Sequence, residues 1–402
     1  MTDVKDIKAD PADEFWMRQA LETAKNAELI APPNPAVGCV IVKDGVELGR
    51  GSTQAPGSAH AEISAINDVY AKGMTPEGAT FYVTLEPCSH YGRTPPCALR
   101  LIKEKAARVV VGTTDPNPLV AGRGIAMLKD AGIAVTTGVC ETEAIESNIG
   151  FITRMKRGTP WVRMKLAASL DGRTALENGM SRWITSEDSR EDGRLMRAHS
   201  QGILTGVGTV RADNPQMNVR LPGNWKDPPK FVCDARGSMP SESRILEGAP
   251  CTVFVAESAS EEAVERITAA GAQTVRVAET ELGKLDLGEV LHEIGKREVN
   301  VLHVEAGARL SGSLMTAGLV DEIVLYVAPC FMGSGKVLAS LPHFERMQDI
   351  YRWRYHAVAT AGSDLKIVLR PQSKECGCVT KTDFQTSERS FLNVYRDYSG
   401  CG

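Results

Sequence analysis

The chain has 402 residues, of which 43% are hydrophobic and 24% are charged, an ordinary globular composition for two or three domains. The net charge of −4 argues against a sequence-independent grip on nucleic acid. No run reaches the roughly 18 apolar residues of a membrane span, and the first residues lack a signal-peptide pattern, so we expect a cytoplasmic protein.

Strands and helices alternate in the first part of the chain, which predicts a three-layer α/β domain over residues 1–150. The expected strands are 36–42, 80–85, 108–112 and 133–136, and the expected helices are 11–29, 60–72 and one after Pro96. Asp44-Gly45 follows the first apolar run and predicts a hairpin turn.

A second alternating block begins at Pro160, after the polar segment 157–160, and a second three-layer α/β domain is expected over residues 151–371. Its expected strands are 161–170, 202–207, 231–234, 252–255, 301–305 and 322–327, with a helix at 186–200. A turn is expected at Asp171-Gly172. Residues 372–402 are polar and lack a sustained period, so we expect a mobile tail there rather than a metal site at Cys376 and Cys378.

Ten cysteines are spread over the chain. In a chain without a secretory signal they indicate a reduced cytosolic protein, so Cys88 and Cys97 are better candidates for a metal or catalytic pair than for a disulfide. His60 opens a predicted helix upstream of them. One imidazole and two thiolates suit Zn²⁺, and three protein ligands leave the fourth position open, as a catalytic site requires.

Glu62 lies two residues after His60, where its carboxylate can sit beside the metal without ligating it. It could take a proton from water and pass it to a leaving amine. H-x-E followed by P-C is the signature of zinc deaminases, although eight residues separate the cysteines here instead of two. The inserted loop offers His90 and Arg93 to a small anionic substrate; the alternative is that both are solvated loop residues.

Two glycine-rich stretches in the second block resemble nucleotide-binding loops only in part. T-G-V-G-T-V at 205–210 lacks the third glycine of a dinucleotide-binding turn, so tight packing between strand and helix explains it as well. M-G-S-G-K-V at 332–337 has Val337 where a phosphate loop has Ser or Thr, and its first glycine is misplaced. Neither stretch identifies a cofactor by itself.

Several longer motifs occur in order along the chain. The first half contains P-N-P-A-V-G-C-V-I-V-K-D-G, H-A-E, T-L-E-P-C-S-H-Y-G-R-T-P-P-C and D-P-N-P-L-V-A-G-R-G. The second half contains K-L-A-A-S-L-D-G-R-T-A, S-R-W-I-T-S, L-M-R-A-H-S, T-V-R-A-D-N-P and V-E-A-G. Together they closely resemble the bifunctional deaminase/reductase family of riboflavin biosynthesis, over about residues 12–370.

The resemblance implies two reactions in one chain. A cytidine-deaminase-like domain would remove the 2-amino group of a diamino-pyrimidinone that carries a ribosylamino 5-phosphate. A dihydrofolate-reductase-like domain would then reduce the opened ribose of the product to ribityl with NADPH. In this family His60, Cys88 and Cys97 match the zinc ligands and Glu62 the proton carrier, while Asn34 matches a substrate-lining position.

For the reductase, the resemblance implies two groups of residues. Ala167, Trp183, Thr209, Asp213 and the stretch 307–313, including Gly307, match positions that hold the nicotinamide cofactor. Ser181, Arg197, Met217, Arg220 and Glu305 match positions that hold the substrate, and the arginines suit its phosphate. Lys165 and Asp171 lie in the same motif block, and Lys165 could polarise the ribose carbon that receives the hydride.

Two other functions compete with this interpretation. A nucleotide or nucleic-acid zinc deaminase would share the zinc site, but it would need little beyond residue 150. A non-catalytic binding protein would keep both folds, but the intact His60, Glu62, Cys88, Cys97 and Asp213 argue against it. We therefore expect a bifunctional enzyme with one zinc ion and NADPH, a small phosphorylated substrate, no nucleic-acid or membrane partner, and a homo-oligomeric state.

Overall fold

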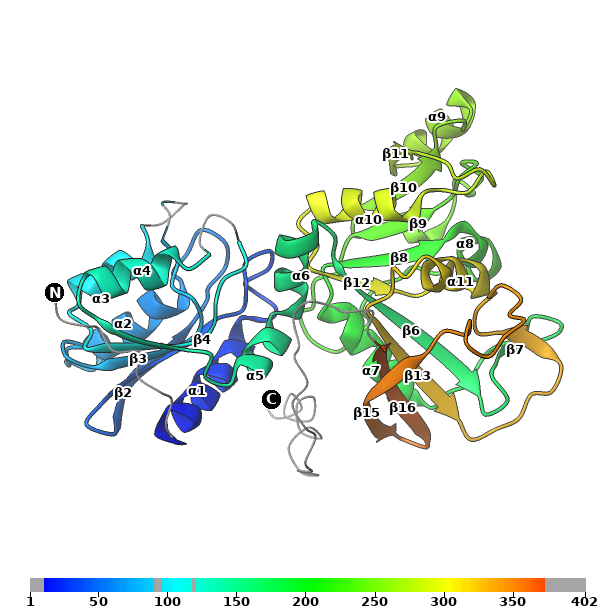
Figure 1. Ribbon diagram of the computed structural model, residues 1–402. Coiled ribbons are helices and arrows are strands. Elements are labelled where there is room, and N and C mark those ends of the chain that lie inside the picture. Colours follow the sequence, from blue (N-terminus) through cyan, green and yellow to red (C-terminus); the bar gives the residue numbers. More distant parts are fainter. Residues whose placement is uncertain (1–10, 90, 92–94, 118–120, 373–402) are drawn as a thin grey trace.

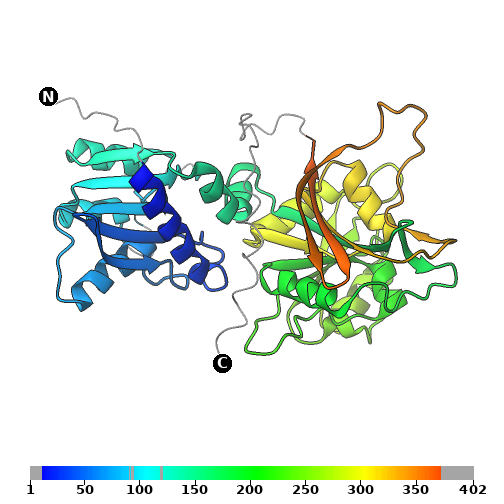
Figure 2. The same ribbon diagram turned by 90° about the horizontal axis from the view of Figure 1, so that it is seen from below.

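The computed structural model describes residues 11–89, 91, 95–117 and 121–372. Two lobes, each built around its own β-sheet, lie side by side and meet at α5 (Glu141–Ser147) and α6 (Ile149–Arg157), as Figures 1 and 2 show. The first sheet ends at residue 137 and the second begins at residue 161. The expected division of the chain at residues 150 and 151 remains a prediction, and the expected tail beyond Gln372 lies outside the described residues.

The first sheet has five strands in the order β2-β1-β3-β4-β5. They are β1 (Gly38–Lys43), β2 (Val46–Ser52), β3 (Thr80–Leu85), β4 (Arg108–Thr113) and β5 (Ala134–Thr137). β1 runs antiparallel to both of its neighbours, and the last three strands are parallel. Asp44 and Gly45 both have positive φ and form the predicted hairpin turn between β1 and β2.

Helices cover both faces of this sheet because side chains alternate along its strands. In β1, Cys39 and Ile41 pack on the face covered by α2, whereas Val40 and Val42 pack on the face covered by α1. The helices are α1 (Pro11–Ala24), the short η1 (Lys25–Ala27), α2 (Ala61–Ala71), α3 (Cys97–Lys103) and α4 (Arg123–Asp130), followed by α5 and α6. The predicted three-layer α/β/α architecture is confirmed for this half.

The second sheet has nine strands in the order β11-β10-β9-β8-β12-β6-β13-β16-β15. They are β6 (Trp161–Ser169), β8 (Gly202–Gly206), β9 (Lys230–Cys233), β10 (Cys251–Ala256), β11 (Gln273–Val277), β12 (Val301–Val304), β13 (Glu322–Ala328), β15 (Trp353–Ala361) and β16 (Asp364–Pro371). Its strands from β11 to β13 pair in parallel, and β16 alone runs in the opposite direction, antiparallel to both β13 and β15. β7 (Arg173–Leu176) and β14 (Gly335–Val337) form a separate ribbon.

Helices again lie on both faces of the large sheet, so the second three-layer prediction is also confirmed. One core layer joins α10 (Leu287–Lys296) and α11 (Ala308–Thr316) to the sheet. The opposite layer contains α7 (Glu187–Ala198), α8 (Val207–Asp213) and α9 (Glu261–Ala269), with the short η2 (Arg244–Leu246) beside them. β11 and the β15–β16 hairpin were not among the expected strands.

Polar contacts hold the segment around Pro33 and join it to the second lobe. Within the first lobe, the Asn148 side chain bonds both the N–H and the C=O of Ala36. Arg154 donates to the Asn300 side-chain oxygen at 2.7 Å and to the Pro33 carbonyl at 3.2 Å. Asn300 donates to the same Pro33 carbonyl at 3.0 Å. The loop that carries the P-N-P motif is therefore held from the side of the second sheet.

Candidate functional site

The three predicted zinc ligands lie together in the first lobe. The Nδ1 atom of His60 is 3.6 Å from the Cys88 Sγ and 3.3 Å from the Cys97 Sγ, and all three ligand atoms lie within 4.8 Å of one another. Ligands held tetrahedrally by one zinc ion at about 2.0 and 2.3 Å are about 3.5 Å apart. The donor set and its spacing therefore fit a zinc ion with three protein ligands.

Each ligand stands at the end of a regular element, which explains why distant residues converge. His60 is the N-cap residue of α2, Cys97 is the first residue of α3, and Cys88 follows the carboxyl end of β3. The backbone N–H of Cys97 also donates to the Cys88 sulfur at 3.2 Å. Hydrogen bonds from Cys97 and His60 outweigh burial and lower the pKa of the Cys88 thiol to about 4, which favours the metal-binding thiolate.

Glu86 fixes the turn that carries Cys88, a role that the sequence patterns did not suggest. Its buried carboxylate accepts backbone N–H groups at 2.9 to 3.2 Å. The donors are Asp115, Gly122, Gly124 and Ile125. A Cβ atom on Gly124 would lie 2.0 Å from the Pro87 carbonyl oxygen, so only glycine fits there. The described ends of the D-P-N-P-L-V-A-G-R-G motif, at Asp115 and at Gly122 and Gly124, thus hold the turn that carries Cys88.

Glu62 lies in the first turn of α2, buried to 4% exposure. Burial raises the pKa of its carboxyl to about 7, and the negative charge of Cys88 acts in the same direction. A carboxyl with a pKa near neutrality can both accept and donate a proton at physiological pH. The predicted proton carrier therefore stands beside the predicted metal ligands in a suitable environment.

The other residues expected near the deaminase site are less well defined. His90 and Arg93 lie outside the described residues. Asn34 follows the Pro32-Pro33 pair, and its backbone N–H closes a turn onto the Ala31 carbonyl. A turn is therefore present at Asn34, while its substrate contact stays a prediction.

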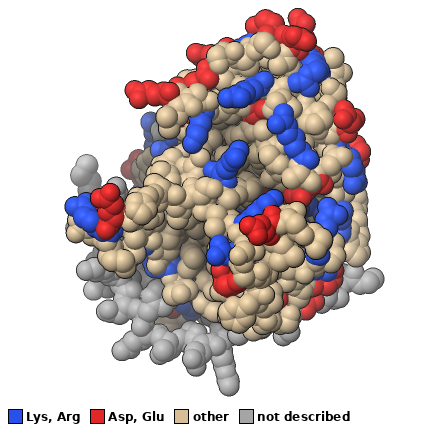
Figure 3. Space-filling view, turned by 90° about the vertical axis from the view of Figure 1, so that its right-hand side faces the viewer, with Lys and Arg blue, Asp and Glu red and all other residues tan. Residues whose placement is uncertain are grey.

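The second lobe contains a cavity of about 530 Å³. Seven of the cofactor and substrate residues expected from the sequence line it: Ala167, Ser181, Trp183, Arg197, Asp213, Met217 and Arg220. Lys165 lines it as well. Figure 3 shows Lys and Arg side chains around a hollow on this side of the molecule.

Glu305 does not line the cavity itself but forms an ion pair with Arg197, which does. The guanidinium of Arg197 donates from Nε and Nη2 to the two carboxylate oxygens of Glu305, at 2.5 and 2.8 Å. His303, which is fully buried, makes a 3.1 Å hydrogen bond to the same carboxylate. Although burial opposes ionisation, Arg197 and His303 hold the pKa of Glu305 well below its usual range. His303 was not among the site residues expected from the sequence, because there it is only one position within an otherwise apolar strand.

The remaining cofactor residues lie at helix ends. The Gly307 backbone N–H, at the start of α11, donates to the Thr209 hydroxyl of α8 at 3.2 Å. Trp183 is 69% exposed, and the Arg190 guanidinium stacks 4.4 Å from its ring centre. Thr209, Gly307 and Glu305 are not among the residues that line the cavity directly.

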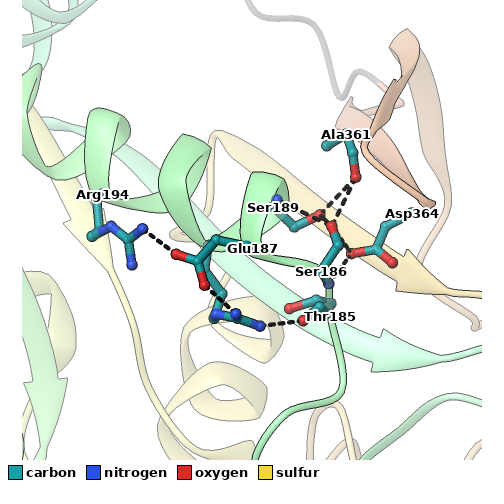
Figure 4. Close-up of polar contacts among 8 residues, drawn as sticks. Thr185, Ser186, Glu187, Ser189, Arg194, Ala361 and Asp364 are labelled. Atoms are coloured by element: carbon teal, nitrogen blue, oxygen red, sulfur yellow. Dashed lines mark hydrogen bonds and ion pairs between the residues drawn. The ribbon is translucent and has the colours of Figure 1, made fainter. Parts of the chain in front are cut away.

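The arginines on α7 are positioned by a polar cluster at the start of that helix (Figure 4). The buried Asp364 carboxylate accepts hydrogen bonds from the Ser186 backbone N–H, the Ser186 hydroxyl and the Ser189 hydroxyl. These contacts join the α7 N-terminus to the tip of the β15–β16 hairpin. Arg190 is further held by Glu187 and the Thr185 carbonyl.

Comparison with known proteins identifies both halves. A family model described as the cytidine and deoxycytidylate deaminase zinc-binding region matches residues 10–113, and one described as the RibD C-terminal domain matches residues 160–367. The riboflavin biosynthesis protein RibD of Escherichia coli strain K12 is 41% identical over 367 residues, which are 88% of this chain and 98% of that protein. The chain belongs to the RibD family.

Solved structures agree with this assignment. Acinetobacter baumannii RibD, form 1, is 39% identical, with a TM-score of 0.81 over 90% of this chain and 99% of that one. A Thermotoga maritima structure titled diaminohydroxyphosphoribosylaminopyrimidine deaminase/5-amino-6-(5-phosphoribosylamino)uracil reductase is 31% identical, with a TM-score of 0.78 over the same shares. The predicted family, the bifunctional deaminase and reductase activity in riboflavin biosynthesis, and the cofactors zinc and NADPH are confirmed.

RibD membership therefore favours the main interpretation over a nucleotide or nucleic-acid deaminase and over a non-catalytic binding protein. Within the described residues, no helix is long and apolar enough to span a membrane.

Proposed function

We propose that the chain first deaminates 2,5-diamino-6-(5-phosphoribosylamino)pyrimidin-4-one. It then reduces the ribosyl group of the product to ribityl. The observation that carries this proposal is the convergence of His60, Cys88 and Cys97 beside the buried Glu62, in a chain that also has an arginine-lined cavity. One cluster suits hydrolysis of an amine, and the other suits a phosphorylated substrate.

In the deamination, His60, Cys88 and Cys97 would hold the zinc ion, and Glu62 would accept and donate protons as the general base and acid. A bound zinc ion supplies a Lewis acid that activates water at its fourth position. Glu62 takes a proton from the attacking water and passes it to the departing amino group, so that a C–O bond forms, the C–N bond breaks and ammonia leaves. Burial at 4% exposure keeps bulk water away from this carboxyl.

In the reduction, Ala167, Trp183, Thr209, Asp213 and Gly307 would hold NADPH, which supplies the hydride when bound. Ser181, Arg197, Met217, Arg220 and Glu305 would hold the substrate, and Asn34 would line the other site. Lys165 is half-buried with its ammonium 5.7 Å from the Tyr326 ring centre. Burial lowers the pKa of Lys165, which suits a group that polarises or protonates a reacting atom.

The first experiment combines metal analysis of the purified chain with assays of both steps. We expect one zinc per chain, ammonia release that does not depend on NADPH, and then NADPH oxidation that depends on the pyrimidine. Zinc without ammonia release would point to another amine substrate. A chain without zinc would show that the loop from Glu86 is structural.

Glu62→Gln separates catalysis from binding. Because the amide cannot accept the proton of the attacking water, we expect deamination to fall by at least 100-fold, the lower range of general acid–base contributions (about 10²–10⁴), with zinc content unchanged. Glu77→Gln is the matched control, since Glu77 pairs with Lys105 at the surface. A Glu62→Gln variant with zinc and near-normal ammonia release would contradict the assigned role.

The native setting of the enzyme is also a proposal. We expect a cytoplasmic homo-oligomer that acts on a small phosphorylated pyrimidine and binds neither nucleic acid nor membranes. Light scattering of the purified protein, with and without substrate, would decide the oligomeric state.

A further inference from the structure

The residues that line the reductase cavity carry more positive than negative charge. The lining cations are Lys165, Arg182, Arg190, Arg197, Arg220 and Arg244. Among the described residues that line the cavity, Asp213 alone is acidic. Two of the arginines are held in short ion pairs, Arg190 with Glu187 and Arg197 with Glu305. Arg244 has only a long ion pair with Glu247, at 3.8 Å, so the cavity keeps positive charge for an anionic ligand.

Arg197 is poorly placed to bind a phosphate, although it lines the cavity. The edge of its guanidinium formed by Nε and Nη2 is occupied by the two oxygens of Glu305. Its Nη1 donates to the Asn218 carbonyl at 2.7 Å. An arginine recognises a carboxylate or a phosphate through the same two-pronged edge, so one such partner excludes a second on that edge. Arg197 instead fixes Glu305.

Arg220 has the opposite character. It makes no hydrogen bond or ion pair within the described part of the chain. Burial lowers the pKa of its guanidinium, and the nearby charges of Arg197, Arg194 and Arg244 act in the same direction. Arg244 lines the same cavity as Arg220. Arg220 and Arg244 thus face the same region, where an anion would relieve their repulsion.

Arg244 is held over this region from η2, on a separate segment of the chain. Its backbone N–H donates to the Asn214 side chain at 2.8 Å, and its Nη2 lies 3.4 Å from the Gln216 side-chain oxygen. Its ion pair with Glu247 is long, at 3.8 Å, and both side chains are more than half exposed. Such a pair holds the guanidinium only weakly.

The loop beneath Arg244 has an unusual backbone. Asn214, Met217 and Arg220 all have positive φ, at 39°, 57° and 54°. Non-glycine residues in this region cost on the order of 1 kcal/mol or more each, and they cluster at ligand sites. The conformation of this loop therefore costs folding free energy, but it directs the loop side chains towards the cavity.

We propose that Arg244 joins Arg220, which the family resemblance already assigns to the substrate, in binding the phosphate of the compound that is reduced, while Arg197 holds Glu305 in position. The inference rests on the proposed function and deepens it. Two guanidinium groups from different segments match a phosphate monoester dianion in charge and in hydrogen-bonding geometry. Arg244 is then a specificity-determining residue for the phosphorylated over the dephosphorylated compound.

The test compares Arg244→Gln with the wild type on two compounds, the deaminated 5-phosphate and its dephosphorylated form. We expect the KM for the 5-phosphate to rise about tenfold or more, as for a lost hydrogen bond to a charged group. The kcat and the KM for NADPH should change by less than about twofold, since the reacting atoms are untouched. With the dephosphorylated compound, the variant and the wild type should behave alike.

Matched variants sharpen the result. Arg297→Gln removes a charge from the C-cap of α10, outside the cavity, and should leave both KM values unchanged. Arg244→Lys keeps the charge without the fork and should give an intermediate KM. An equal rise in KM for both compounds would show that Arg244 merely supports the 214–217 loop, and would refute the inference.

The outcomes also separate this inference from the proposed function. A wild-type enzyme that oxidises no NADPH with the 5-phosphate would refute the proposed reduction itself. An active wild type, with Arg244→Gln unchanged and Arg182→Gln impaired only on the 5-phosphate, would refute the assignment of Arg244 alone.

Discussion

At the scale of single residues, the reductase site depends on a buried chain of charges. His303 bonds Glu305, and Glu305 pairs with Arg197 at the cavity. Burial lowers the pKa of His303 despite the opposing influence of Glu305, while Arg197 and Arg163 lower it further. His303 is therefore neutral at physiological pH and can donate a hydrogen bond to the carboxylate. A neutral donor stabilises Glu305 without adding positive charge beside Arg197.

This buried histidine predicts a pH dependence of stability. Because its folded-state pKa lies below the usual value of about 6.5, the unfolded chain binds the proton more readily. The stability is fully present above about pH 6.5 and declines as the pH falls, by up to about 1.4 kcal/mol per pH unit for one proton. Urea unfolding between pH 7.5 and 5.5 should show that His303→Gln reduces this slope.

Gln at position 303 keeps a hydrogen-bond donor for Glu305 and does not titrate. The exposed His343 supplies the matched control, and His343→Gln should keep the wild-type slope. If His303→Gln and the wild type lose stability in parallel, another group accounts for the acid sensitivity.

At the scale of elements, α7 contains two of the arginines that line the reductase cavity, Arg190 and Arg197. It brings Arg190 to the Trp183 ring and Arg197 to Glu305. Its N-terminus is held by Asp364, a residue of a different strand pair. The hairpin β15–β16 thus contributes to the cavity without lining it. The sequence pattern predicted helix α7 correctly. It did not indicate that Asp364 holds the start of this helix, because Asp364 lies far away in the chain.

Asp364→Ala tests this anchor. The Ser186 backbone N–H and two hydroxyl groups would lose a buried carboxylate acceptor, at a cost of about 2 kcal/mol. Thermal unfolding should show the loss, and NADPH oxidation should fall more than ammonia release, because α7 belongs to the second lobe. Asp364→Asn keeps one acceptor oxygen and should be milder. Asp349→Ala breaks only a surface pair with Arg346 and should have little effect; an equal effect of the two alanine variants would count against the anchor.

At the scale of the whole molecule, the sequence predicted both α/β lobes and the grouping of His60, Cys88 and Cys97 in one cluster. Local signals were strong there: β-branched runs, glycine turns, and a His, Glu and Cys pattern at fixed order. β15 was missed because its residues are largely exposed, and β16 because most of its residues are only half-buried, so neither strand has a clear apolar face. Glu86, His303 and Arg244 were missed because their roles depend on contacts between segments far apart in the chain. Periodicity carries no information on such pairings.

The separation of the lobes leads to the last prediction. Cys88 lies after β3, whereas every residue lining the reductase cavity lies between positions 165 and 244. Cys88→Ala should therefore abolish zinc binding and ammonia release but spare NADPH oxidation when the deaminated intermediate is supplied.

Gly150→Ala provides the contrasting variant at the junction. A Cβ there would lie 2.5 Å from a Val301 side-chain atom and 2.8 Å from the Asn300 carbonyl oxygen. The Asn300 side chain donates a hydrogen bond to the Pro33 carbonyl in the first lobe, and Val301 is the first residue of β12 in the second lobe. We expect this variant to impair both assays while zinc content is retained. Loss of both activities in a folded Cys88→Ala variant would instead mean that the metal loop supports the reductase, and that the two sites are not independent.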